Sequence, residues 1–199
     1  MSEEPVSSRI LTIPNLISFV RLAAIPVFWW LLLGTDDVRS AAILFAVIAT
    51  TDWVDGYLAR RLDQVTKLGK ALDPVADRLM IASAVIAGLI TEIVPPVIGI
   101  TLIVREVYMS IVVFGLMARR GETIDVSGLG KVATFIIYSS VGWFYMAAIP
   151  FLEPLTRPLA WIAGVVGLLL YWITAVQYTA VARRKLATTT GQQSNEKQN

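Results

Sequence analysis

The stretch that decides the fold of this chain is DWVDGYLARRLDQVTKLGKALDPVAD, residues 52–77. It places aspartates at positions 52, 55, 73 and 77. Strongly apolar segments flank it, LFAVIATT before and RLMIASAVIAGLI after. An uncompensated charge at membrane depth costs at least about 2.5–3.5 kcal/mol, so carboxylates placed here require a partner or a function.

The spacing of the aspartates predicts a metal site. Asp52 and Asp55 (i,i+3) share one helix face, and Asp73 and Asp77 (i,i+4) share a face of the next helix. Two such pairs facing each other form a cage of hard oxygen ligands, which suits Mg²⁺ or Mn²⁺ and not zinc. The chain contains no His and no Cys, so softer ligand sets are excluded. The alternative is a set of solvated carboxylates at two helix ends, which the fixed spacing and apolar flanks disfavour.

The composition indicates a membrane protein of one domain. Of 199 residues, 56% are hydrophobic and 16% charged, and the mean hydropathy is +0.67. A soluble domain of this size could not hide so much apolar surface. The formal net charge of +2 is too small to indicate a nucleic-acid partner. Residues 1–9 carry Glu3 and Glu4 beside Arg9, a poor start for a signal peptide, so we expect the first apolar segment to be retained.

The hydropathy pattern predicts an all-α integral membrane protein with six transmembrane helices and an N-terminal interfacial helix. The segment RILTIPNLISFVRL, residues 9–22, is expected to be that amphipathic helix, broken near Pro14. The second span should continue helically through the aspartate stretch to Arg60. The expected spans cover residues 22–33, 41–52, 69–90, 97–117, 132–149 and 159–181.

Three parts are therefore expected along the chain. Residues 1–8 and 186–199 are polar and are expected to be disordered, and residues 9–185 form the membrane domain.

The basic residues crowd on one side of this six-span arrangement. The opposite loops contain only Arg39 and Arg157. The positive-inside rule therefore places both termini and the aspartate stretch in the cytoplasm, in a multi-pass protein of the cell membrane. The basic residues on the cytoplasmic side are Arg60, Arg61, Lys67, Lys70, Arg119, Arg120, Lys131, Arg183, Arg184 and Lys185.

The aspartate stretch resembles the signature of the CDP-alcohol phosphatidyltransferase family, D-x2-D-G-x2-A-R-x8-G-x3-D-x3-D. The resemblance covers residues 10–185. All eight specified positions are filled, by Asp52, Asp55, Gly56, Ala59, Arg60, Gly69, Asp73 and Asp77.

The resemblance implies a CDP-linked donor, usually CDP-diacylglycerol, and an alcohol acceptor whose hydroxyl displaces CMP from the β-phosphorus. It implies that Asp52, Asp55 and Asp73 hold two metal ions, Mg²⁺ or Mn²⁺, about 3.5–4 Å apart. Asp77 would be a partial metal ligand and the general base on the acceptor hydroxyl. A homodimer is also implied.

The same resemblance implies a set of residues that bind the CDP group. Gly56 and Ala59 are small where a nucleotide must approach a helix closely, and Arg60 offers a charge-assisted fork to phosphate. Gly56 could instead provide space for helix packing. The implied CDP-binding residues are Asp52, Gly56, Ala59, Arg60 and Gly69.

Two polar features farther along predict an acceptor pocket. Arg105, followed by Glu106, interrupts the fourth span, and Lys131 opens the fifth. Both cations could bind an acceptor phosphate, or they could be an intramembrane ion pair and a snorkelling lysine. Family members that make phosphatidylglycerophosphate carry R-E-x6-R and G-K-x-K-T here, whereas this chain has Val113 and Ala133 in place of the second Arg and the second Lys. Two missing cations suit phosphatidylglycerol, a monoanionic diester, as the acceptor and cardiolipin as the product; the alternative is glycerol 3-phosphate.

Two other classes of protein remain as alternatives. A cation carrier or channel would also place aspartates inside a membrane, but it has no need for a nucleotide-sized gap beside an arginine. A small membrane scaffold would not need carboxylates arranged for metals. CMP release from CDP-diacylglycerol separates the enzyme from both.

Overall fold

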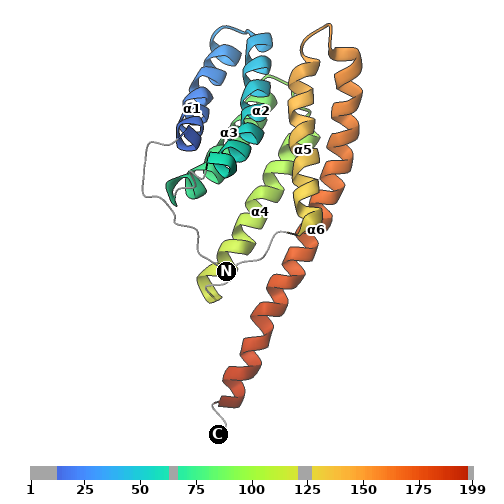
Figure 1. Ribbon diagram of the computed structural model, residues 1–199. Coiled ribbons are helices and arrows are strands. Elements are labelled where there is room, and N and C mark those ends of the chain that lie inside the picture. The colour runs from blue at the N-terminus through green and yellow to red at the C-terminus, as the bar shows by residue number, and fades with distance from the viewer. Residues whose placement is uncertain (1–12, 63–66, 121–126, 197–199) are drawn as a thin grey trace. The chain divides into compact units, whose positions relative to one another are not determined.

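The computed structural model describes residues 13–62, 67–120 and 127–196, with side chains for 16–51, 75–118 and 127–183. Within these ranges the chain forms helices joined by short turns and contains no strand, which confirms the all-α class. The elements are α1 (Ile13–Trp29), the π-helix η1 (Trp30–Gly34), α2 (Val38–Leu62), α3 (Lys67–Ile90), α4 (Pro96–Arg120), α5 (Gly128–Ala147) and α6 (Glu153–Glu196), and Figure 1 shows their course.

The helices lie where the apolar segments predicted them. The interfacial helix expected over residues 9–22 is not a separate element: α1 begins at Ile13, includes Pro14 and runs without interruption through Arg21 into the first apolar segment. Pro14 does not break the helix, because proline is tolerated in the first turn. α2 continues through Asp52 to Leu62, as the helical reading of the aspartate stretch required. Both helices therefore include polar residues, such as Arg21 in α1 and Asp52 in α2, that flank the apolar segments.

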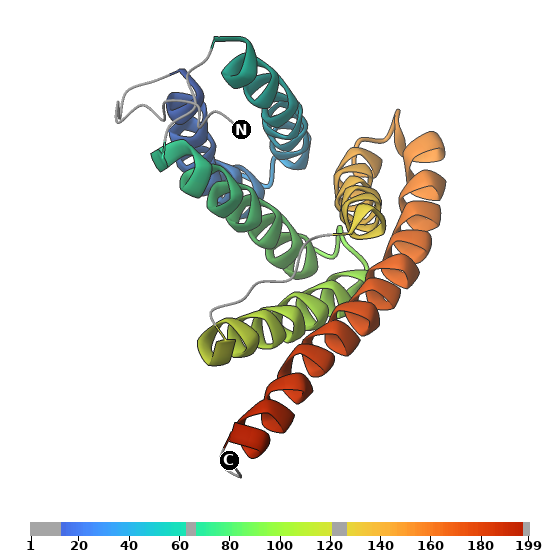
Figure 2. The same ribbon diagram turned by 60° about the horizontal axis from the view of Figure 1, so that its bottom comes forward.

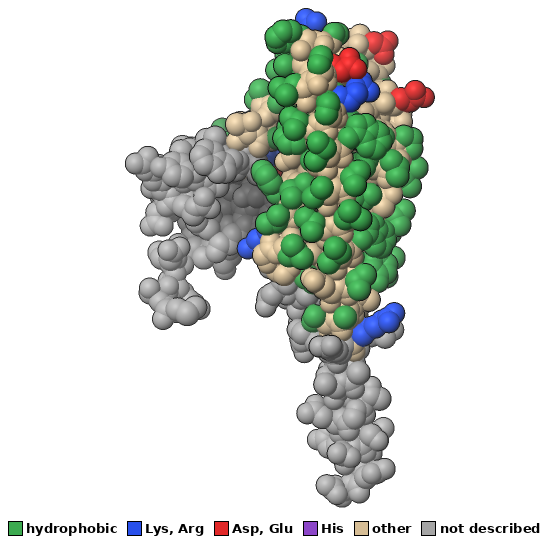
Figure 3. Space-filling view, turned by 90° about the vertical axis from the view of Figure 1, so that its right-hand side faces the viewer, with side chains coloured by type: hydrophobic (Ala, Val, Ile, Leu, Met, Phe, Trp, Pro, Cys, Tyr) green, Lys and Arg blue, Asp and Glu red, His purple; other side chains and the backbone are tan. Residues whose placement is uncertain are grey.

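The surface fits a membrane environment. Three helical segments in the described part are long and apolar enough to cross a membrane: Leu16–Gly34, Pro96–Ala118 and Glu153–Arg183. Large apolar side chains on α4, α5 and α6 are exposed, among them Phe114, Phe135 and Ile162. Figure 3 shows hydrophobic side chains spread over this face, with charged ones near the two ends of the coloured surface. Such a surface suits lipid and not water, and the full set of six spans stays a prediction.

The C-terminal tail differs from the sequence expectation. Disorder was expected for residues 186–199, but α6 continues to Glu196. After Arg184 the chain contains no proline and one glycine, Gly191, so little in its sequence stops a helix that the apolar span has already nucleated. Residues 1–8, for which disorder was also expected, lie outside the described part.

The chain divides into two compact units: Met1–Pro95 with Val141–Pro158, and Pro96–Ser140 with Leu159–Asn199. In the first unit α1 packs against α2 and α3. Phe28, Phe45 and Tyr145 form an aromatic core with ring centroids 5.4–6.1 Å apart. The indole N–H of Trp29 donates to the hydroxyl of Ser83, which ties α1 to α3.

The second unit is built on close contacts between α5 and α6. A Cβ atom at Gly167 would lie 2.8 Å from the backbone nitrogen of Ile137, so a larger residue could not sit there without moving a helix. One turn earlier, a Cβ at Gly164 would lie 3.0 Å from both Ser140 and Ile98. Small residues permit this close helix packing inside membranes. Figure 2 shows α4 lying beside the same stretch of α6.

Candidate active site

The aspartate stretch lies on two consecutive helices of the first unit. α2 carries Asp52 and Asp55, and α3 carries Asp73 and Asp77. This confirms the expectation that each pair occupies one helix at i,i+3 or i,i+4 spacing. The side chains of residues 52–74 lie outside the described part, so the positions of Asp52, Asp55, Gly56, Ala59, Arg60, Gly69 and Asp73 are those of the helix backbone.

Asp77 is the one member of the set whose side chain is described. Its carboxylate is 39% exposed and forms an ion pair with the guanidinium of Arg21, which is 2% exposed. α1 supplies Arg21, and the packing of α1 on α3 brings the two side chains together. A buried arginine needs such a partner, because the charge would otherwise be desolvated without compensation. The pair therefore fixes the direction of the Asp77 carboxylate.

The donor set fits a hard divalent metal. Among the residues with described side chains, no group of three or more acidic, His or Cys residues lies together. Three of the four expected ligands, Asp52, Asp55 and Asp73, fall outside that search. The donors that the stretch offers are all carboxylates, the ligand type that Mg²⁺ and Mn²⁺ prefer, and the exposed part of Asp77 leaves its carboxylate accessible.

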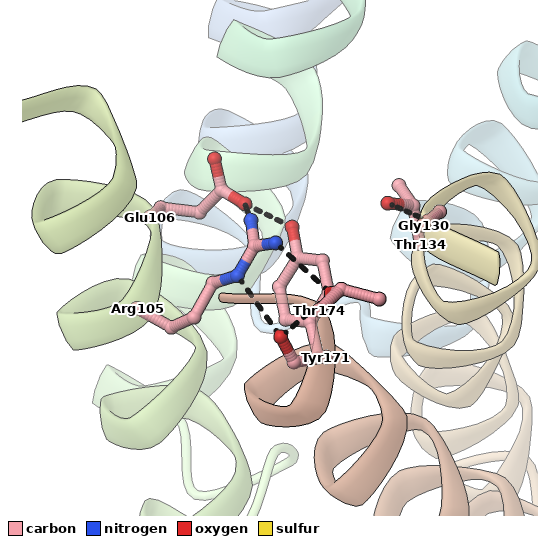
Figure 4. A network of polar contacts seen from close by, with 6 residues as sticks. All are labelled: Arg105, Glu106, Gly130, Thr134, Tyr171 and Thr174. Carbon is pink, nitrogen blue, oxygen red and sulfur yellow. Dashed lines mark hydrogen bonds and ion pairs between the residues drawn. The ribbon is translucent and has the colours of Figure 1, made fainter. Parts of the chain in front are cut away.

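The second unit contains a buried polar network around Arg105 (Figure 4). The guanidinium Nη1 donates to Glu106 Oε1 at 3.1 Å, and Nε donates to the carbonyl of Tyr171 at 3.4 Å. Nη2 lies 3.5 Å from the hydroxyl of Thr174, and the guanidinium carbon lies 3.6 Å from the centroid of the Tyr171 ring. The Tyr171 hydroxyl donates to the same carboxylate oxygen of Glu106. The intramembrane ion pair that the sequence left open is therefore present.

This pairing does not use all of the arginine. A guanidinium has five N–H groups, and three of those of Arg105 have acceptors in the described part of the chain. The two others, one on each terminal nitrogen, remain for an oxyanion. A planar arginine held in this way can bind a phosphate in two-pronged fashion.

Lys131 lies in the first turn of α5 with its side chain exposed. Ser127 precedes the helix, and its hydroxyl accepts a hydrogen bond from the N–H of Gly130 at 3.1 Å. The hydroxyl of Tyr178 on α6 accepts from the N–H of Ser127 at 2.8 Å and holds this turn against α6. The first turn of α5 therefore brings a lysine to a helix end that already attracts anions. Lys131 and Arg105 are both cations whose side chains carry no acceptor atom, so they could be joined only through an anion that binds both.

Sequence reasoning missed Arg21, Tyr171 and Thr174, as well as Ser127 and Tyr178 at the first turn of α5. Arg21 lies in the segment expected to be an interfacial helix, and Tyr171 and Thr174 lie in an expected apolar span. The signal for Arg21 was available, because an arginine in an apolar helix needs an acidic partner at the same depth. Tyr171 and Thr174 carried no comparable signal, because both occur often in membrane helices.

The chain is similar to proteins of known class. The model of the CDP-alcohol phosphatidyltransferase family matches residues 11–188. Enzymes of this family use CDP-alcohol substrates with alcohol acceptors and depend on divalent metals.

Three relatives illustrate the similarity. A protein of Streptomyces coelicolor, "Cardiolipin synthase (CMP-forming)", is 36% identical over 89% of this chain and 86% of its own length. "CDP-diacylglycerol--glycerol-3-phosphate 3-phosphatidyltransferase" of Bacillus subtilis is 36% identical over 76% of this chain and 86% of its own. The protein with the same name in Shigella flexneri serotype 5b is 35% identical over 87% and 96%. The aspartates on α2 and α3, the apolar helices and these matches together show that the chain belongs to the CDP-alcohol phosphatidyltransferase family.

Proposed function

We propose that this protein transfers the phosphatidyl group of CDP-diacylglycerol to phosphatidylglycerol in the membrane and so makes cardiolipin and CMP. The donor is supported by the filled signature on α2 and α3, and by relatives whose names state this chemistry. The acceptor is supported by the uncharged residues Val113 and Ala133.

The chemistry follows from the roles proposed for the aspartates. Asp77 takes the proton from the acceptor hydroxyl, the hydroxyl oxygen bonds to the β-phosphorus, and the bond to the CMP oxygen breaks. Arg21 on α1 holds the carboxylate of Asp77 in a fixed orientation through their ion pair. Asp52, Asp55, Asp73 and Asp77 would hold two Mg²⁺ or Mn²⁺ ions, which neutralise the pyrophosphate charge when bound.

The donor is proposed to lie along α2. Gly56 and Ala59 leave room for the nucleotide, and Arg60 binds its phosphate. Asp52 and Gly69 complete this set. The active site is proposed to lie at the cytoplasmic side of the plasma membrane in a six-span protein, which the distribution of Lys and Arg supports. The homodimer that the family resemblance implies is part of the same proposal.

The observation that carries the acceptor is the loss of two cations. The G-K-x-K-T pattern of family members that make phosphatidylglycerophosphate has Lys where this chain has Ala133, and Ala133 is fully buried in the second unit. Arg105 and Lys131 remain as the proposed acceptor-binding residues. Each charge-assisted contact contributes about 1.5–3 kcal/mol, so two missing contacts would weaken a monoester by roughly two to four orders of magnitude. A diester whose acyl chains stay in the bilayer needs fewer contacts.

Glycerol 3-phosphate is the second candidate acceptor. The relatives of Bacillus subtilis and Shigella flexneri are named for it, at nearly the same identity as the cardiolipin synthase. A further cation, for example Arg119 or Arg120, could replace the missing pair in that case.

One experiment tests the reaction, the metal and the acceptor. Purified protein in mixed micelles receives CDP-diacylglycerol with phosphatidylglycerol or with glycerol 3-phosphate, with and without EDTA, and the lipid product is identified by mass. We expect cardiolipin and CMP, and no product in EDTA until Mg²⁺ or Mn²⁺ is restored. Phosphatidylglycerophosphate without cardiolipin would overturn the acceptor, and CMP release in EDTA would overturn the metal. A protein that conducts cations and releases no CMP would be a carrier.

A further inference from the structure

Tyr171 contacts the Arg105–Glu106 pair in three different ways (Figure 4). Its ring lies under the guanidinium of Arg105, with 3.6 Å from the guanidinium carbon to the ring centroid. Its carbonyl accepts a hydrogen bond from Arg105 Nε at 3.4 Å, and its hydroxyl donates to Glu106. The Tyr171 side chain is 1% exposed and its hydrogen bond with Arg105 is buried, whereas its contact with Glu106, a side chain that is 27% exposed, is partly buried.

Helix geometry alone does not bring Arg105 and Glu106 together. Neighbouring residues of an α-helix point about 100° apart, and adjacent side chains do not face each other. Their 3.1 Å hydrogen bond therefore requires both side chains to turn toward α6. Tyr171 holds them there, because the ring supports the guanidinium while the hydroxyl supplies a donor to the carboxylate.

Thr174 completes this support from the same helix. It lies three residues after Tyr171, with its hydroxyl 2.9 Å from the Tyr171 carbonyl and 3.5 Å from Arg105 Nη2. The guanidinium plane is thus fixed by contacts to Nε, Nη1 and Nη2 and by the ring beneath it. The two N–H groups that have no acceptor in the described part of the chain then point in fixed directions.

We propose that Tyr171 is a positioning residue for the acceptor, holding Arg105 so that its two remaining N–H groups meet the acceptor phosphate. This inference rests on the proposed function, in which Arg105 binds that phosphate. A planar fork binds a phosphate well in a narrow range of orientations. A guanidinium free to rotate would lose acceptor affinity while leaving the donor site on α2 and α3 unchanged.

The test is Tyr171→Phe, which keeps the ring beneath Arg105 and removes the hydroxyl that reaches Glu106. We expect the KM for the acceptor to rise about tenfold or more, since a hydrogen bond to a charged group is lost. The KM for CDP-diacylglycerol and the kcat at saturating acceptor should stay within about twofold. Thr174→Val, which removes the contact to Nη2, should shift the acceptor KM in the same direction and serves as the test if Tyr171→Phe does not fold.

Tyr145→Phe is the matched control. Tyr145 is also buried, and its hydroxyl donates to the carbonyl of Ala84 at 2.6 Å in the first unit, outside the Arg105 network. Both variants therefore lose a hydroxyl from a buried tyrosine, and Tyr145→Phe controls for the general effect of that loss on folding. We expect Tyr145→Phe to change neither KM, even where it lowers the unfolding temperature.

A double-mutant cycle identifies the route of the effect. If Tyr171 acts through Glu106, then Tyr171→Phe should raise the acceptor KM by less than about twofold in a Glu106→Leu background, where the Tyr171 hydroxyl has lost its carboxylate acceptor. Unchanged acceptor KM values in both α6 variants, equal increases for both substrates, or full additivity in the cycle would each overturn the inference. The identity of the acceptor is read separately, from the product of the wild-type protein. If that product is phosphatidylglycerophosphate, the acceptor assignment fails and the same variants are measured with glycerol 3-phosphate; a wild-type protein that releases no CMP overturns both proposals.

Discussion

Asp77→Asn separates the catalytic role of this carboxylate from its structural role. The general base is lost, which costs about 10²–10⁴-fold in turnover, or about 2.7–5.4 kcal/mol of activation free energy. The fold should be affected less. Asparagine keeps an oxygen that accepts a hydrogen bond from Arg21, but the buried guanidinium loses its counter-charge. Because the hydrogen bond remains and Asp77 is 39% exposed, we expect a cost of about 1.5–3 kcal/mol, below that of breaking a fully buried ion pair. For a chain of this length that lowers the unfolding temperature by about 3–12 °C.

The assay follows CMP release and thermal unfolding of the same purified preparation. The matched control is Glu153→Gln, which also removes a carboxylate from an arginine, Arg157, at 3.0 Å, but in an exposed pair. An exposed pair contributes about 0–1 kcal/mol, so this control should keep both turnover and stability. Asp77→Asn that retains more than about a tenth of wild-type turnover would refute the assignment of the base. A turnover loss that matches the unfolded fraction at the assay temperature would show a structural role instead.

Two further predictions follow from the charge distribution and from the helix packing. In this cysteine-free chain, single cysteines at Thr35 and Ser194 should react differently with an impermeant thiol reagent on intact cells, the first labelled and the second protected; equal or reversed labelling would contradict the topology. Gly167→Ala should destabilise the second unit by about 1–3 kcal/mol, because its Cβ would lie 2.8 Å from the Ile137 backbone. Gly115→Ala, with nothing within 4 Å of the new Cβ, should leave stability unchanged or raise it by about 0.4–1 kcal/mol, and thermal unfolding of both variants checks the difference.

The sequence was sufficient to predict the helices but not all of their ends. Long apolar segments bounded by charged residues are the strongest signal of a membrane helix. Four of the six expected spans lie within one helix; the first covers α1 and η1, and the fifth extends two residues past the end of α5 at Ala147. The ends differ because charges do not stop a helix. α4 continues to Arg120, three residues past Met117. α6 begins at Glu153 although Pro154 follows, because proline is tolerated in the first turn, and it continues through Pro158 inside the helix.

The candidate site was predictable in part. The spacing of the aspartates placed them on two helices, because i,i+3 and i,i+4 relations are local properties of the chain. The contact between Arg21 and Asp77 is not local. The two residues are 56 positions apart, and which side chains meet depends on how α1 packs against α3. Similarly, the sequence placed Arg105 beside Glu106 but gave no sign that Tyr171 lies beneath the guanidinium.

Arg21 and Arg105 are both buried in apolar helices, and each has an acidic partner. The exposure of that partner differs, at 39% for Asp77 and 27% for Glu106. The more exposed carboxylate, that of Asp77, can still take part in proton transfer or metal binding. The carboxylate of Glu106 binds both Arg105 and Tyr171, which suits it to orienting the arginine. Each pair compensates the desolvation of a buried arginine. The two pairs leave different groups available: the carboxylate of Asp77 in the first unit, and two N–H groups of Arg105 in the second.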